Sequence, residues 1–202
     1  MGWYCLPEII TFSKMNKTFE LPITRIGEPD WVNKLQSYLE NNDIACTGES
    51  LATIEQAEAT LELQLPKQIK KYYLHFGTTS DSDYMYNLKL VTELVRLFAT
   101  NLSFITLNFR MSEIDTMIVF SESPGGDPLC FDFKTGAIYL FSHDPVKKVK
   151  VFNDLSQYVI HELLETERLV GDSGLSEDDT RKLTDEYLSG EGIDYAFRTM
   201  KL

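Results

Sequence analysis

The sequence predicts a single domain of the α+β class, in which helices and an antiparallel sheet occupy different parts of the chain. Three observations lead to this prediction. Apolar residues at helical spacing fill residues 29–77, short apolar runs between turn residues fill 117–142, and a further helical pattern begins near 155. Because the expected strands follow one another without helices between them, an alternating α/β arrangement is disfavoured.

Three helices are expected before residue 78. The first follows Pro29, a residue well suited to the first turn of a helix, and carries apolar residues on one face. The second is expected to start at Thr53, with Gln56 completing a capping box. Pro66 interrupts the pattern and can open the third helix, which Gly77 is expected to end in a left-handed conformation.

The segment from 78 to 116 carries weaker signals. Residues 78–85 are polar and predict a loop. We expect a strand at 87–91, a short helix at 92–99 and a second strand at 104–109, where apolar and polar residues alternate.

The clearest strand signals come after residue 116. The uninterrupted apolar run 117–120 is typical of a central strand, and 129–133 alternates between two faces. Gly136 is expected to close a hairpin turn, with 137–142 as the returning strand. A basic connection with lysines at 147, 148 and 150 then leads to a long helix capped by Asn153 or Asp154.

We expect the chain to divide into three parts. Residues 1–28 form an N-terminal extension packed on the core, residues 29–170 the main domain, and residues 171–202 an acidic, helical C-terminal extension. The glycine-containing stretch 171–174 is the expected linker, and Ser176 is expected to cap the extra C-terminal helix.

The charge of the chain restricts its partners. Thirty-one acidic residues against 19 basic ones give a formal net charge of −12. Such a surface repels nucleic acid and anionic lipid and favours fast association with a basic protein. Three scattered cysteines, no signal-peptide pattern and no apolar run of membrane-spanning length predict a cytoplasmic protein. The oligomeric state stays open.

A search for chemistry gives no catalytic residues, no metal ligands and no cofactor motif. None of the three histidines has a catalytic spacing with serine or cysteine, and phosphate-binding glycine motifs are missing. A metal reading of Asp127, Asp132, His143 and Asp144 lacks the order of a calcium loop, and such residues at turns usually satisfy nearby backbone amides. We therefore expect no enzyme.

Residues 123–128, with the sequence SPGGDP, stand out because they combine prolines and glycines in one place. Glycines allow sharp turns and close approach, and prolines stiffen the chain on either side. A tight loop that leads into the hairpin is the simpler interpretation, and a rigid binding loop is the functional alternative.

The order of these motifs resembles the SMI1/KNR4 family of the SUKH superfamily over about residues 30–165. The matching positions on which we expect the fold to depend are Glu58, Leu65, Pro66, Tyr72, Gly77, Gly136 and Tyr139, together with the GGDP loop at 125–128. The first 28 and last 30 or so residues fall outside the resemblance, and the segment 87–115 has no motif that aligns.

The resemblance implies a twisted antiparallel sheet with helices packed against it, and a binding role without catalytic residues. Many bacterial members look like immunity proteins that neutralise polymorphic toxins, often nucleases, whereas fungal relatives are cell-wall regulators. We expect a basic toxin domain as the partner, with a regulatory scaffold as the alternative and a hydrolase with an unrecognised carboxylate site ranked last. The residues expected to face the partner are Asp81, Asp83, Gly125, Gly126, Asp127, Asp132, Glu177, Asp178 and Asp179.

Overall fold

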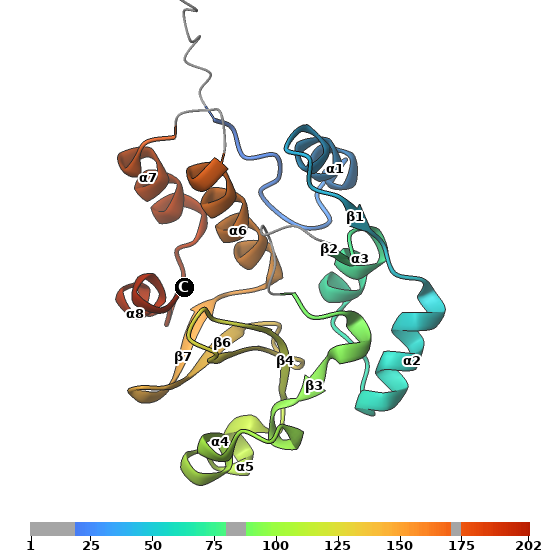
Figure 1. Ribbon diagram of the computed structural model, residues 1–202, viewed down its shortest axis with the longest axis vertical. Helices are drawn as coiled ribbons and strands as arrows, with labels where there is room; N and C mark the ends of the chain where they lie inside the picture. The colour runs from blue at the N-terminus through green and yellow to red at the C-terminus, as the bar shows by residue number, and fades with distance from the viewer. Residues whose placement is uncertain (1–18, 80–87, 171–174) are drawn as a thin grey trace, which may run out of the picture.

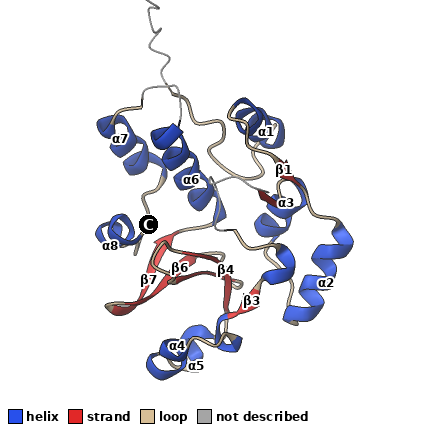
Figure 2. Ribbon diagram, viewed as in Figure 1, coloured by secondary structure: helices blue, strands red, loops and turns tan. Residues whose placement is uncertain are grey.

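The computed structural model describes residues 19–79, 88–170 and 175–202. These residues form eight α-helices, two short 3₁₀ helices and seven strands (Figures 1 and 2). In chain order they are α1 (Trp31–Asn41), β1 (Cys46–Thr47), α2 (Leu51–Leu61), α3 (Lys67–His75), β2 (Thr78–Thr79), η1 (Val91–Glu93), β3 (Val95–Arg96), η2 (Leu97–Ala99), α4 (Ser103–Asn108), α5 (Met111–Ile114), β4 (Met117–Glu122), β5 (Pro128–Asp132), β6 (Ile138–His143), β7 (Val146–Phe152), α6 (Leu155–Val170), α7 (Glu177–Tyr187) and α8 (Tyr195–Lys201).

A five-stranded antiparallel sheet in the order β3-β4-β5-β6-β7 forms the centre of the molecule. The main core joins one face of this sheet to α1, α2, α3 and α6. The short helices α4 and α5 cover the opposite face and share a smaller core with it (Figure 1). The predicted α+β class, with an antiparallel sheet and helices packed against it, is therefore confirmed.

Strand β4 shows why the apolar run at 117–120 is uninterrupted. Ile118 and Phe120 point into the main core, whereas Met117 and Val119 point into the smaller core. Successive side chains of a strand alternate between faces, so a strand covered on both sides needs apolar residues at every position. The prediction of a central strand here is confirmed.

The first three helices lie where the sequence predicted them, with one change at a cap. The second helix begins after Ser50, and the Ser50 hydroxyl accepts a hydrogen bond of 3.1 Å from the Thr53 backbone N–H. The expectation that Thr53 caps this helix was therefore wrong, because Thr53 lies inside the first turn as the donor that the true cap satisfies.

Glu58 fixes the break between α2 and α3. Its carboxylate is buried, accepts a 2.6 Å hydrogen bond from the Leu65 N–H and pairs with the Lys70 ammonium at 2.7 Å. Pro66 then stands at the cap of α3, and Gly77 follows that helix at φ 50°. A Cβ on Gly77 would collide with the carbonyl oxygen of the neighbouring strand β1, so the position requires glycine.

The segment between residues 88 and 116 was predicted incorrectly. Its described residues at 88–91 form no strand, the expected helix at 92–99 is two 3₁₀ turns around the two-residue strand β3, and the expected strand at 104–109 is the helix α4. The alternating apolar residues at 104–109 suggest a strand, but in the fold only Ile105 of α4 is fully buried, where it packs against the sheet. Tertiary packing therefore overrides the short local pattern.

The basic connection expected after residue 145 is in fact strand β7, which pairs with β6 along its length. Val149 and Val151 are buried on the main core side, whereas Lys148 lies over the Tyr139 ring at 4.6 Å on the other face. Lysine and valine alternate here with the two-residue period of a strand. The lysines made the segment look like an exposed connection, although their apolar stems can lie along the sheet.

The C-terminal residues pack onto β7 and α6. Ser176 caps α7 as expected, and a further helix, α8, follows it. Leu188, Ile193 and Phe197 are buried, and the Asp194 N–H donates to the Lys150 carbonyl of the edge strand β7. The expected linker 171–174 and residues 1–18 lie outside the described residues, and the division into three parts stays a prediction.

Candidate functional site

The SPGGDP loop is a closed turn between β4 and β5. The Gly126 N–H donates to the Ser123 carbonyl and the Ser123 N–H donates to the Asp127 carbonyl, each at 2.8 Å. Pro124 occupies the second position of the turn, where its fixed φ is favourable, and Gly126 adopts φ 78°. Gly125 and Gly126 are exposed at the tip. The loop is thus held in one conformation by its own backbone.

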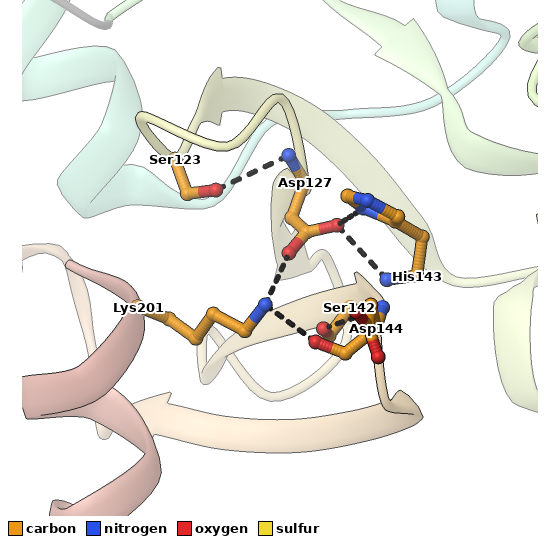
Figure 3. A network of polar contacts seen from close by, with 6 residues as sticks. All are labelled: Ser123, Asp127, Ser142, His143, Asp144 and Lys201. Atoms are coloured by element: carbon orange, nitrogen blue, oxygen red, sulfur yellow. Dashed lines mark hydrogen bonds and ion pairs between the residues drawn. The ribbon is translucent and has the colours of Figure 1, made fainter.

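Asp127 points inward from this loop and connects it to two other parts of the chain (Figure 3). Its Oδ1 accepts hydrogen bonds from the backbone N–H of His143, at 2.9 Å, and from the His143 ring. Its Oδ2 lies 3.5 Å from the ammonium of Lys201 on α8, which also donates to the Asp144 carbonyl at 2.6 Å. One carboxylate therefore joins the loop, the β6–β7 turn and the C-terminal helix.

The electrostatics of Asp127 agree with this role. Burial raises the pKa of its carboxyl, but the hydrogen bonds from His143 and the charges of His143 and Lys201 outweigh burial and lower the pKa below its usual range. The side chain is 1% exposed. Asp127 is consequently an ionised group used within the fold, and its carboxylate has no open face for a partner.

Asp132 is also used internally, at the opposite end of β5. Its two carboxylate oxygens accept hydrogen bonds from the Lys134 N–H and the Thr135 hydroxyl, at 3.0 and 2.9 Å. Gly136 adopts φ 80° and donates its N–H to the Asp132 carbonyl. Asp132 therefore shapes the hairpin turn, as aspartate at turns commonly does.

The acidic residues of α7 have the opposite character. Glu177, Asp178 and Asp179 are exposed in the first turn, and no residue described in this helix is buried. Asp178 pairs with Arg181 and Asp179 with Lys182, both within the helix, at 2.6 and 3.2 Å. Surface pairs of this kind contribute little stability, so these carboxylates remain available to solvent and to a partner.

The predicted partner-facing residues therefore occupy different environments. Asp81 and Asp83 lie outside the described residues. Gly125, Gly126 and the α7 carboxylates are exposed, whereas Asp127 and Asp132 are buried and bonded within the fold. Of the four residues weighed as metal ligands in the sequence, the structure brings Asp127, His143 and Asp144 together. In the part of the chain that the structure describes, however, no group of three His, Cys, Asp or Glu side chains is suited to holding a metal.

The sequence did not indicate the contact between Lys201 and Asp127. The two residues are far apart in the chain, and Lys201 lies in a helix that was not expected as a separate element. Only the packing of α8 against β7 brings them together. A contact between segments this far apart in the chain leaves no local sequence pattern from which it could be predicted.

A small pocket beside the GGDP loop was also missed. It has a volume of about 240 Å³ and lies between α6 and the β4–β5 hairpin, with Ser121, Tyr158 and Glu162 among its lining residues. Burial, and then the charge of Glu165, raises the pKa of Glu162 to about 7. A carboxylate hydrolase would need a second carboxyl of raised pKa in the same cleft.

Comparison with known families places the chain in one of them. The family model described as SMI1-KNR4 cell-wall (SUKH_6) matches residues 51–159, more than half of the chain. The protein therefore belongs to the SMI1/KNR4 family of the SUKH superfamily. The match starts at α2 and ends within α6, so α1, α7 and α8 lie outside it. A search of curated proteins gave no match.

No helix among the residues described is long and apolar enough to cross a membrane.

Proposed function

We propose that this protein is a non-enzymatic, cytoplasmic immunity protein that binds a basic toxin domain and neutralises it. The observation that carries the proposal is the α7 surface, where exposed carboxylates stand on a helix with no buried residue among those described. Membership of a family with many immunity-like members supports the binding role. The net charge of −12 supports a basic partner.

The physical argument concerns the active site of a nuclease-type toxin. Such a site must be basic, because it holds phosphates, and an acidic protein is therefore steered toward it. Three α7 carboxylates, Glu177, Asp185 and Glu186, have no ion pair within the described residues. They are the charges that a basic partner meets without first breaking an existing pair.

A regulatory scaffold is the second candidate, and the family description as a cell-wall family favours it. It would use the C-terminal part to dock a partner of its own. Leu188 and Phe197 are buried in the domain, however, and Arg198 donates to the carbonyls of Val151 and Leu188. The apolar residues of this part support the domain itself, which leaves its acidic face for binding.

The first test is the association rate with a toxin domain encoded beside the gene, measured by stopped flow between 50 and 500 mM salt. We expect the rate to fall steeply as salt rises, because exposed charges are screened beyond about 10 Å at 0.1 M. Absence of binding to any such domain would remove the immunity proposal. Binding with a salt-independent rate would remove the charge argument alone.

A further inference from the structure

The pocket beside the GGDP loop adjoins a larger pocket, and the two together form a hollow along α6. A second pocket of about 560 Å³ lies next to it between α6, α7 and α8, and the two share the lining residues His161, Glu165, Arg168 and Leu202. The pocket beside the GGDP loop, called the inner pocket below, therefore adjoins a pocket that is partly lined by the acidic helix α7.

The inner pocket has a polar floor. Tyr158 and Ser121 are almost fully buried, and their hydroxyl oxygens lie 3.4 Å apart. Glu162 lies one helical turn after Tyr158 on α6, and a hydrogen bond from the Tyr158 hydroxyl counters part of the rise in its pKa. The two hydroxyls and the Glu162 carboxyl thus line a cavity whose other lining residues include Leu129 and Pro124.

The cations around this hollow are already committed. Arg168 donates two hydrogen bonds to Glu165, and the Arg198 guanidinium donates to two backbone carbonyls. Arg181 lines only the larger pocket, where it forms an exposed pair with Asp178. Burial lowers the pKa of His161 to about 4, so this ring is neutral at pH 7. An anion entering the pocket would therefore meet carboxyl groups without a free cation.

Glu162, in contrast, has no cationic partner among the residues that the structure describes. None of the ion pairs found in the described ranges includes it. The other carboxylates at the rim are paired, Glu165 with Arg168 and Glu122 with Lys89, both at 2.7 Å. Glu162 is half-buried in the pocket, and a partly desolvated carboxyl without a counter-ion favours its neutral form, so an entering cation would restore its charge.

We propose that this pocket binds an alkylammonium or guanidinium group, with Glu162 as counter-ion and the hydroxyls of Tyr158 and Ser121 as hydrogen-bond acceptors. A cavity of about 240 Å³ leaves room for a butylammonium or propylguanidinium group. The cation comes from a free polyamine or from a lysine or arginine side chain of a bound protein. The second source rests on the proposed function.

Cation binding is expected to release a proton, since Glu162 must ionise to pair with the ligand. The titratable and charged groups that face Glu162 are Tyr158, His161, Glu165 and Arg168 of α6, Glu122 of β4 and Tyr72 of α3. The raised pKa of Tyr158 and the lowered pKa of His161 keep both groups neutral between pH 6 and 8. Over this range Glu162 is therefore expected to dominate the proton change.

The test is calorimetric titration of the full chain with n-butylammonium chloride at pH 6, 7 and 8, in buffers of different ionisation enthalpy. We expect binding to strengthen from pH 6 to 8, with proton release at pH 7. The Glu162→Gln variant is expected to bind at least tenfold more weakly and to release no proton. Glu191→Gln, an exposed change of the same charge, is expected to stay within twofold of the wild type.

Two further probes separate the sources. Spermidine binding at least tenfold tighter than a lysine-containing tripeptide with blocked ends assigns the pocket to free polyamines, and the reverse assigns it to a protein side chain. No butylammonium binding to the wild type, preferential binding of inorganic phosphate, or equal affinity of Glu162→Gln would overturn the proposal. These readouts need no toxin, so they stand apart from the test of the immunity function.

Discussion

Two groups of carboxylates in this protein look alike in the sequence and differ completely in the structure. Asp127, inside the family-matched region, is buried and holds His143 and Lys201. The carboxylates of α7, outside that region, are exposed and touch solvent along the whole helix. The difference teaches that an acidic residue beside a conspicuous loop is not thereby a binding residue. The burial of the side chain and its bonding partners within the fold decide whether it can bind another protein.

The family-matched region and the C-terminal part also differ as a whole in what they contribute to the fold. The family-matched region 51–159 contains all five strands of the sheet, together with the helices α2 and α3. The C-terminal part adds no strand in its described residues 175–202, but it covers the outer edge of β7 through Asp194 and reaches Asp127 through Lys201. Covering an edge strand prevents it from pairing with another chain. This part therefore combines a buried structural side with an exposed acidic side.

The largest expected effect concerns the buried side of α8. Phe197→Ala should lower the free energy of unfolding by about 3–5 kcal/mol, because the ring is buried against the main core and its loss leaves a cavity. Urea denaturation measures the change. Met200→Ala, which alters an exposed residue of the same helix, should change stability by less than about 0.5 kcal/mol. Equal effects would contradict the two-sided description of α8.

A smaller loss is expected at Asp127. Asp127→Ala should cost about 1–3 kcal/mol, because it leaves the His143 N–H without its acceptor and removes the carboxylate that pairs with Lys201. Asp144→Ala is the matched control, since Lys201 uses only the backbone carbonyl of that residue. If Asp127→Ala unfolds at the wild-type urea concentration, the carboxylate does not hold these elements together.

The pH dependence of stability should separate Asp127 from Glu162. The pKa of Asp127 is lowered in the fold, so its contribution is present above pH 4 and is lost as pH falls through the folded value. The pKa of Glu162 is raised to about 7, so stability from this group is present below about pH 4 and is lost as pH rises toward 7.

Glu162→Gln removes the second of these effects. Its stability relative to wild type should rise by about 1–2 kcal/mol between pH 5 and pH 8, because the wild type then carries a half-buried charge without a counter-ion. Thermal unfolding at several pH values measures the difference. A constant difference across this range would mean that Glu162 ionises normally in the fold.

The smallest effect on stability is expected on α7. The triple change Glu177→Gln, Asp185→Asn and Glu186→Gln should alter the free energy of unfolding by less than about 1 kcal/mol, since all three side chains are exposed. Circular dichroism during thermal unfolding checks this. A large loss would show that these carboxylates support the fold and would weaken their assignment to a partner.

The parts of the fold that the sequence predicted have strong local signals. The sheet strand 117–120, the Gly136 turn and the helix after Asp154 each combine an apolar period with a turn or cap residue, and Asp154 does accept a hydrogen bond from the Gln157 N–H. Strand β7 and helix α4 escaped prediction because lysines hid the period of one and a short alternation misrepresented the other. The candidate site was harder still, because burial of Asp127 and the pocket at Glu162 arise only from packing between distant segments.

The central claim is that the exposed carboxylates of α7 meet a basic partner. Its most direct test is the association rate of the α7 triple variant with the cognate toxin domain at 50 mM salt. The control carries Glu40→Gln, Glu55→Gln and Glu62→Gln, which remove the same charge from exposed positions on or next to α1 and α2. We predict a rate about tenfold lower for the α7 variant than for this control. Equal rates for the two variants would contradict the claim.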